Sequence, residues 1–143
     1  MADKGDSSAI VFFIDRCLGG GEVADSLKAA GFFVEVHDSH FARDCRDQDW
    51  IPVVSQRGWV ILSKDPRMMR RCVAWDILVQ ANAAVFYLLS ARMPASEMVE
   101  TFHSAMPRML SLLRTHTRPL ICTVSPAGKV EVREGQRRGG VRR

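Results

Sequence analysis

The sequence lacks any apolar run long enough to cross a membrane. The longest runs, such as residues 81–89, fall well short of the ~20 residues that a spanning helix needs, and this one contains Asn82. The opening residues, MADKGDSSA, are polar and include an early acid, unlike the basic and then apolar start of a signal peptide. We therefore expect a cytoplasmic protein with no membrane partner.

Closely spaced cysteine pairs are also missing. The four cysteines are scattered along the chain, at Cys17, Cys45, Cys72 and Cys122. In a chain expected in the cytoplasm, such cysteines are better explained as free thiols than as a disulfide framework. His37, His40 and Cys45 invite comparison with a zinc site, but their spacing is loose and no fourth ligand is evident. We favour the interpretation that they are loop residues, near a substrate.

The charge balance is moderately basic, with 20 Lys and Arg against 16 Asp and Glu and a net charge of +4. The surplus is concentrated near the end of the chain, at Arg133, Arg137, Arg138, Arg142 and Arg143. A nucleic-acid partner and a solvated tail explain this surplus equally well. A length of 143 residues and a hydrophobic content of 47% indicate one globular domain. We expect that domain over residues 1–134 and a flexible basic tail over residues 135–143.

Apolar strand patterns and helical patterns alternate four times along the chain. We expect strands over residues 9–14, 32–36, 59–62 and 83–89. Helices are expected over residues 23–30, 47–57 and 66–80, with a long fourth helix from Pro94. The last segments, residues 119–124 and 129–133, are expected to form a hairpin. The alternation predicts an α/β fold with a mainly parallel sheet and helices on both faces.

The fourth helix carries methionine and phenylalanine along one side, which is typical of a helix packed on a core. The stripe comprises Met98, Phe102, Met106, Met109, Leu110 and Leu113. An apolar helix face of this kind is also able to dock a partner helix. Pro107 lies inside the pattern and is expected to kink or divide the helix.

Three aspartates are expected at the carboxyl edge of the sheet, where folds of this class bind ligands. Asp15 follows the first strand, Asp65 follows the third, and Asp47 begins the helix between the second and third strands. Clustered carboxylates repel one another unless a cation lies between them, and oxygen ligands favour Mg²⁺ or Mn²⁺. Taken singly, Asp47 and Asp65 are explained as helix caps. Taken together, the three acids favour a metal site for phosphodiester hydrolysis.

The chain resembles the PIN domains, and in particular the VapC-type toxins of toxin–antitoxin pairs. The resemblance is carried by FFIDRCLGGGEVADSLKAAGFFVEVH, DQDW and GWVILSKD. It implies a three-layer α/β/α fold and a Mg²⁺- or Mn²⁺-dependent endoribonuclease that a protein antitoxin neutralises. Asp15, Asp47 and Asp65 match the family's first, middle and last acids, so the resemblance assigns them both catalysis and metal binding.

Two positions depart from the family pattern. Cys17 stands where these proteins often have a small polar residue, two positions after the first acid. The family's remaining acid, a further metal ligand, has no clear counterpart. Asp38 is our choice for it, and the alternatives are Glu22, Asp25 and Asp49.

Basic residues beside the acids are candidates for binding RNA phosphates. Arg67, Arg70 and Arg71 follow Asp65, and the flanking residues Arg16 and Lys64 are also candidates; a plain solvated face explains them about as well. A catalytically inactive RNA-binding module of the same fold and a receiver-like signalling domain are the alternative functions. The receiver reading is weaker because Ile14, rather than a second acid, precedes Asp15. The hairpin and the methionine-rich helix are compatible with a homodimer, an antitoxin contact or the core alone.

Overall fold

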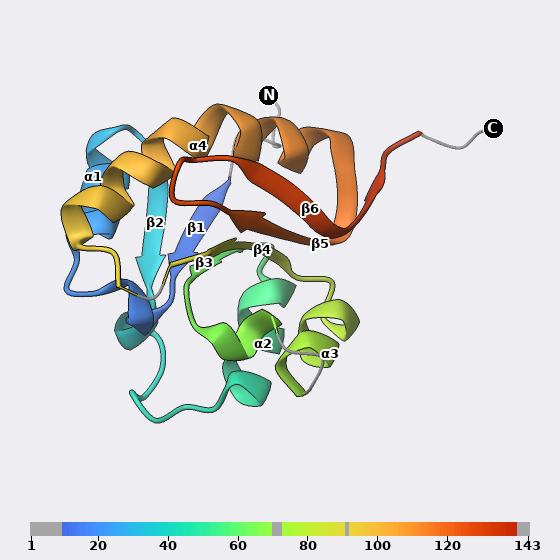
Figure 1. Cartoon of the computed structure of the whole chain (residues 1–143). Helices are drawn as coiled ribbons and strands as arrows, with labels where there is room; N and C mark the ends of the chain where they lie inside the picture. Colours follow the sequence, from blue (N-terminus) through green and yellow to red (C-terminus); the bar gives the residue numbers. More distant parts are fainter. Residues whose placement is uncertain (1–9, 70–72, 91, 140–143) are drawn as a thin grey trace.

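A six-stranded sheet forms the centre of the computed structural model, which describes residues 10–69, 73–90 and 92–139 (Figure 1). The spatial order of the strands is β2-β1-β3-β4-β5-β6. Their bounds are β1 Val11–Ile14, β2 Phe33–Val36, β3 Val60–Ser63, β4 Ala84–Leu88, β5 His116–Val124 and β6 Val130–Arg137. The first five strands are parallel, and β6 runs antiparallel to β5. The predicted mainly parallel sheet and the C-terminal hairpin are therefore confirmed.

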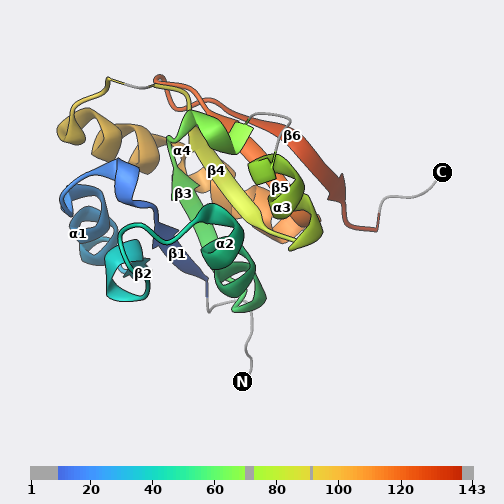
Figure 2. The same ribbon diagram turned by 90° about the horizontal axis from the view of Figure 1, so that it is seen from below.

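Helices cover both faces of this sheet, giving three layers. Their bounds are α1 Glu22–Ala29, α2 Asp47–Gln56, α3 Val73–Gln80 and α4 Ala95–Thr115. α1 and α4 lie on one face, and α2 and α3 lie on the other (Figures 1 and 2). β3 and β4 are buried along their whole length because both of their faces pack against helices. The predicted three-layer α/β/α fold is confirmed.

The helix predicted over residues 66–80 differs from the observed structure. Pro66–Met69 form a short 3-10 helix and α3 begins at Val73, while residues 70–72 lie outside the described part of the chain. Asp65 accepts a hydrogen bond from the backbone N–H of Arg67 at 3.0 Å, which stabilises this first turn. The 3-10 helix begins directly after Asp65, two residues beyond the end of β3 at Ser63.

Pro107 was expected to kink or divide the long helix, and it does not divide it. α4 continues through it from Ala95 to Thr115. Pro107 is exposed, so water can satisfy the carbonyl group that loses its helical partner at the proline. Of the predicted stripe, Met98, Phe102, Met106 and Met109 are buried, while Leu110 and Leu113 are partly buried against the same core.

The predicted tail begins too early. β6 continues to Arg137, which pairs with His116, and Gln136 pairs with Thr117. Gly135 was interpreted as the start of a mobile segment, but it lies within β6, where a Cβ would come within 2.7 Å of Leu120 Cδ1. Arg142 and Arg143 lie outside the described residues. Within the described ranges, no helix has both the length and the apolar character needed to cross a membrane.

Candidate active site

The first acid is held at the junction of two neighbouring strands. β1 and β3 are paired with Ile14 opposite Leu62, and the backbone N–H of Asp15 donates to the Leu62 carbonyl at 3.0 Å. The side chain of Asp15 is buried, and the backbone N–H of Arg16 donates to its Oδ1 at 2.8 Å. Parallel strand pairing therefore fixes this carboxylate at the carboxyl edge of the sheet.

Ser63 connects the first acid to the last. Its buried hydroxyl donates to Asp15 Oδ2 at 2.9 Å and accepts the backbone N–H of Asp65 at 3.1 Å. One side-chain oxygen therefore orients both the Asp15 carboxylate and the chain that carries Asp65. The sequence interpretation did not include Ser63, although it stands two residues before Asp65 at the end of the third strand.

All three predicted catalytic acids line one open cleft of about 260 Å³. The lining is completed by Arg16, Cys17, Arg43, Trp50 and Arg67. Asp47 is the first residue of α2, and its Oδ1 accepts the indole N–H of Trp50 at 3.1 Å. The N-cap of this helix is Arg46, with no side-chain capping bond. Asp47 is thus turned to the cleft and to Trp50, and a capping role alone does not explain it.

Burial raises the pKa of Asp15 above its ordinary value. The hydrogen bonds from Ser63 and Arg16 oppose this shift, while the negative charges of Asp47 and Asp65 add to it. The three acids therefore interact electrostatically across the cleft. A positive charge placed among them would relieve the repulsion and favour the ionised form of Asp15.

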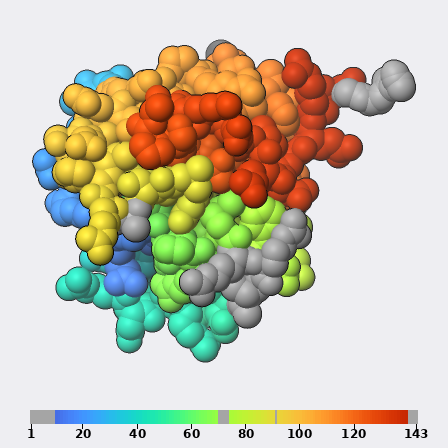
Figure 3. Space-filling view, in the orientation of Figure 1, coloured from blue at the N-terminus to red at the C-terminus, as the bar shows by residue number. Residues whose placement is uncertain are grey.

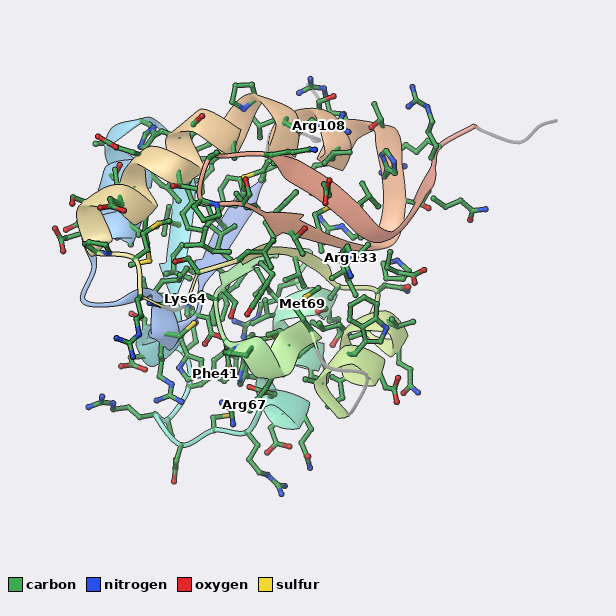
Figure 4. The ribbon with its side chains drawn as sticks, viewed as in Figure 1. Phe41, Lys64, Arg67, Met69, Arg108 and Arg133 are labelled. Carbon is green, nitrogen blue, oxygen red and sulfur yellow. The ribbon has the colours of Figure 1, made fainter. Side chains whose placement is uncertain are left out.

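Asp65 already has a positive partner in Arg67. Arg67 Nη2 lies 2.7 Å from Asp65 Oδ2, and Arg67 Nε donates to both carboxylate oxygens at 3.1 and 3.2 Å. Burial alone would raise the pKa of Asp65, but the hydrogen bonds and charge of Arg67 lower it overall. The guanidinium group of Arg67 is thus a counter-ion to Asp65 within the cleft. Figure 4 labels Arg67, Lys64 and Phe41 on the half of the molecule that contains α2.

Cys17 contacts the same cluster. Its Sγ lies 3.8 Å from Asp15 Oδ2 and 3.4 Å from Ser63 Oγ, and it accepts the backbone N–H of Lys64 at 3.2 Å. Burial and the charge of Asp15 raise the pKa of Cys17 to about 11, so the thiol is neutral near pH 7. The thiol stands beside the first acid as a weak donor, while Ser63 provides the strong hydrogen bond.

The cleft offers the hard oxygen donors that Mg²⁺ or Mn²⁺ prefers. Asp15, Asp47 and Asp65 face one another closely enough to shift the pKa of Asp15, and a divalent ion would balance that charge. These residues therefore fit such an ion in their chemistry. In the described ranges, however, no three His, Cys, Asp or Glu side chains are arranged as a ready-made metal-binding group. Asp65 is bound to Arg67 in this arrangement.

The predicted fourth acid lies in a neighbouring cleft. Asp38 contacts His37 Nδ1 at 3.1 Å, and its Oδ2 is 3.9 Å from Arg43 Nε. Its cleft also includes Asp15, but neither Asp47 nor Asp65. The alternatives Glu22, Asp25 and Asp49 are exposed and do not line the cleft of the three acids. The assignment of a fourth metal ligand stays a prediction, and the placement of Asp38 does not favour it.

Only some of the basic residues predicted to bind phosphates are found in the lining of the cleft of the three acids. Arg16 and Arg67 line the cleft of the three acids, whereas Lys64 is not part of its lining. Arg70 and Arg71 lie outside the described residues. Arg43 also lines the cleft and was missed, because it is in the loop between β2 and α2, where the sequence has no periodic pattern. Three arginines and three aspartates therefore share one cleft.

The zinc alternative has no support among the described residues. His37 contacts Asp38, and His40 Nε2 lies 2.7 Å from Glu35 Oε1. Cys17, Cys45 and Cys122 are free, as predicted, while Cys72 lies outside the described residues.

Comparison with known proteins identifies the class. Residues 10–90, more than half of the chain, match the family model described as a PIN-like domain, and the chain belongs to this family. The predicted family resemblance is thereby confirmed.

One relative is similar to most of the chain. It is the protein of Mycobacterium tuberculosis named Putative ribonuclease VapC45, which is 27% identical over 124 residues, or 84% of this chain and 89% of that protein. No solved structure matches.

Proposed function

We propose that the protein is a metal-dependent endoribonuclease, the toxin of a VapBC-like toxin–antitoxin pair. The observation that carries this proposal is the gathering of Asp15, Asp47 and Asp65 in one cleft of a PIN-like fold. The similarity to the protein named Putative ribonuclease VapC45 supports RNA as the substrate. Asp15, Asp47 and Asp65 would hold Mg²⁺ or Mn²⁺, which supplies water activation and neutralises charge at the phosphoryl oxygen when bound.

The chain's own residues have three roles in this proposal. The carboxylates orient the reacting groups, and Ser63 keeps Asp15 in place by the hydrogen bond at 2.9 Å. Arg16 and Arg43 line the same cleft and are exposed, so they are placed to bind phosphate oxygens. Arg67 would exchange its partner, from the Asp65 carboxylate to the phosphate, as the cation and RNA enter.

RNA cleavage by the purified protein with Mn²⁺ or Mg²⁺ tests the proposal. Asp47→Asn and Asp49→Asn form a matched pair, since both acids are in the first turn of α2 but only Asp47 lines the cleft. We expect Asp47→Asn to lower the cleavage rate at least ~100-fold and Asp49→Asn to leave it nearly unchanged. Cleavage that persists in EDTA, or an equal loss in both variants, would count against the proposal.

The toxin role is tested in cells. Expression of the wild-type chain in a bacterial host should arrest growth, whereas Asp65→Asn expressed at the same level should not. A protein antitoxin encoded beside the gene should restore growth and co-purify with the chain. Growth arrest by the Asp65→Asn variant would show that toxicity does not depend on the acid site, and would count against the proposed toxin mechanism. A homodimer stays a prediction, which sedimentation of the purified protein would test.

A second candidate is an RNA-binding module without catalysis. The contact between Arg67 and Asp65 favours it, because a guanidinium group already neutralises one of the three acids. RNA binding that needs no divalent ion, together with no cleavage at any Mn²⁺ concentration, is the result that this alternative expects.

A further inference from the structure

A second and larger cleft, of about 480 Å³, adjoins the cleft of the three acids. It lies between the end of β1, the start of α1 and the turn after β2. The two clefts share Asp15, Arg16 and Arg43. In Figure 3 the blue segment that follows β1 and the teal loop after β2 meet at the lower left of the molecule. A group bound in this second cleft would therefore lie next to the proposed reacting phosphate.

One part of the lining of this cleft is apolar. Its apolar members are Ile14, Leu18, Val23, Ala24 and Val36. The loop Gly19–Gly20–Gly21 completes the wall with no side chains, and an added Cβ at any of the three would meet nothing within 4 Å. Gly19 and Gly21 have φ angles of +99° and +120°, which disfavour other residues, whereas Gly20 is outside that region. The cleft is thus open beside the glycine loop.

Its charges are balanced. Asp15 and Asp38 oppose Arg16 and Arg43 in the lining. A second phosphate would require a surplus of positive charge, whereas an uncharged group with polar edges fits an apolar cleft that has a few polar residues. In RNA, that group is the base, because single-stranded bases can leave the stack and enter protein pockets.

Asp38 is oriented as a hydrogen-bond acceptor. Its partner His37 is buried and packs against Phe41 and Trp50, with ring centroids 5.6 and 5.5 Å apart. His37 Nδ1 lies 3.1 Å from Asp38 Oδ1, and His37 Nε2 has no hydrogen-bond partner in the described structure. The Asp38 side chain remains 51% exposed, and its Oδ2 is 3.9 Å from Arg43, beyond hydrogen-bond distance. This carboxylate can therefore accept bonds from a ligand.

We propose that this cleft binds the base adjoining the scissile phosphate and prefers guanine, recognised by Asp38. Guanine presents two neighbouring N–H donors on its Watson–Crick edge, which match the two oxygens of a carboxylate. Uracil, adenine and cytosine each place an acceptor beside their donor on that edge, which the carboxylate repels. The inference rests on the proposed function, since it takes RNA as the ligand and places the base beside the phosphate.

Binding of labelled oligonucleotides in EDTA tests this preference without requiring cleavage. The probes are three fluorescein-labelled heptaribonucleotides: seven uridines, the same sequence with a central guanosine, and the same sequence with a central inosine. We expect the guanosine probe to bind at least about fivefold more tightly than the all-uridine probe, the low end of a bidentate contact. Inosine lacks the amino group, so its probe should lose most of that advantage.

Two matched pairs of variants locate the site. Asp38→Asn should remove the preference for guanosine, while Asp44→Asn, an exposed acid of the same loop outside the cleft lining, should keep it. Gly20→Leu should weaken binding of the guanosine probe more than binding of the other two probes, and Gly20→Ala should change the binding of all three little. Thermal melts of the four variants check that the fold is retained.

The outcomes separate this inference from the proposed function. Equal binding of the three probes, no RNA binding, or a preference that persists in Asp38→Asn would overturn the guanine site. A guanosine preference in a protein that never cleaves RNA would support the site and refute the nuclease. Cleavage of RNA without any base preference would support the nuclease and refute the guanine site.

Discussion

Replacement of Asp15 by asparagine is expected to stabilise the protein while it abolishes activity. Asp15 is buried at 7% exposure, and both its burial and the charges of Asp47 and Asp65 oppose its ionisation. An amide at position 15 carries no charge. Its oxygen can accept the Arg16 N–H and its nitrogen can donate to Ser63, whose hydroxyl can turn toward Cys17. The substitution therefore removes a buried charge and preserves the hydrogen bonds with Arg16 and Ser63.

The expected gain is about 1–2 kcal/mol at pH 7 without divalent ions, the lower part of the range found when buried ion pairs are replaced by neutral residues. For a chain of this length, this corresponds to a rise in Tm of roughly 3–8 °C.

The gain should depend on pH in a defined direction. The folded-state pKa of Asp15 is raised, so the wild-type protein loses stability as pH rises from the unfolded value of 3.8 through the folded pKa. The difference between Asp15→Asn and the wild type should therefore vanish below that window and reach a plateau above it.

Thermal and urea denaturation in EDTA at several pH values would measure this difference. Asp49→Asn, which removes an exposed charge, is the control and should change stability little. A variant less stable than the wild type at pH 7, or a gain that grows toward acid pH, would refute the reasoning about the buried carboxylate.

Three further predictions concern the same cluster. Ser63→Ala should lower stability by about 1.5–3 kcal/mol, measured by urea denaturation, because the buried hydroxyl bonds a charged group; an unchanged midpoint would contradict this. Arg67→Gln should raise the pKa of Asp65, measured by NMR titration. The same substitution should tighten Mn²⁺ binding, measured by calorimetry, and weaken RNA binding. Weaker Mn²⁺ binding would contradict the competition between the arginine and the ion. Cys17 should react slowly with iodoacetamide at pH 7 because its thiol is neutral, and Asp15→Asn should speed the reaction by lowering the thiol pKa; unchanged reactivity would contradict the contact.

The strand pattern was sufficient to predict the framework and the position of Asp15 and Asp65 at one edge of the sheet. The apolar runs that precede Asp15 and Asp65 indicate buried parallel strands. The residues that follow such strands lie at one edge of the sheet. Asp47 was predictable because the helix before the third strand begins there. The position of the three acids in one cleft follows from topology more than from local detail.

Other features depend on contacts that no periodicity records. Ser63 looks like the last residue of a strand, and its role follows only from the placement of Asp15 beside it. Arg43 comes from an irregular loop, whose path is set by tertiary packing. Pro107 and Gly135 carry breaker signals, but the exposed surface of α4 tolerates the proline, and Gly135 lies within a paired strand close to the Leu120 side chain.

The most direct test is a Mn²⁺ titration that follows Tm and the RNA cleavage rate in the same preparation. Because a cation that binds the folded state stabilises it, Tm should rise with Mn²⁺, and cleavage should begin over the same concentration range. Both responses should be absent in Asp15→Asn, which we expect to keep the fold. Cleavage without Mn²⁺ or Mg²⁺, or a wild-type rise in Tm that Asp15→Asn retains in full, would contradict a catalytic metal site formed by these three acids.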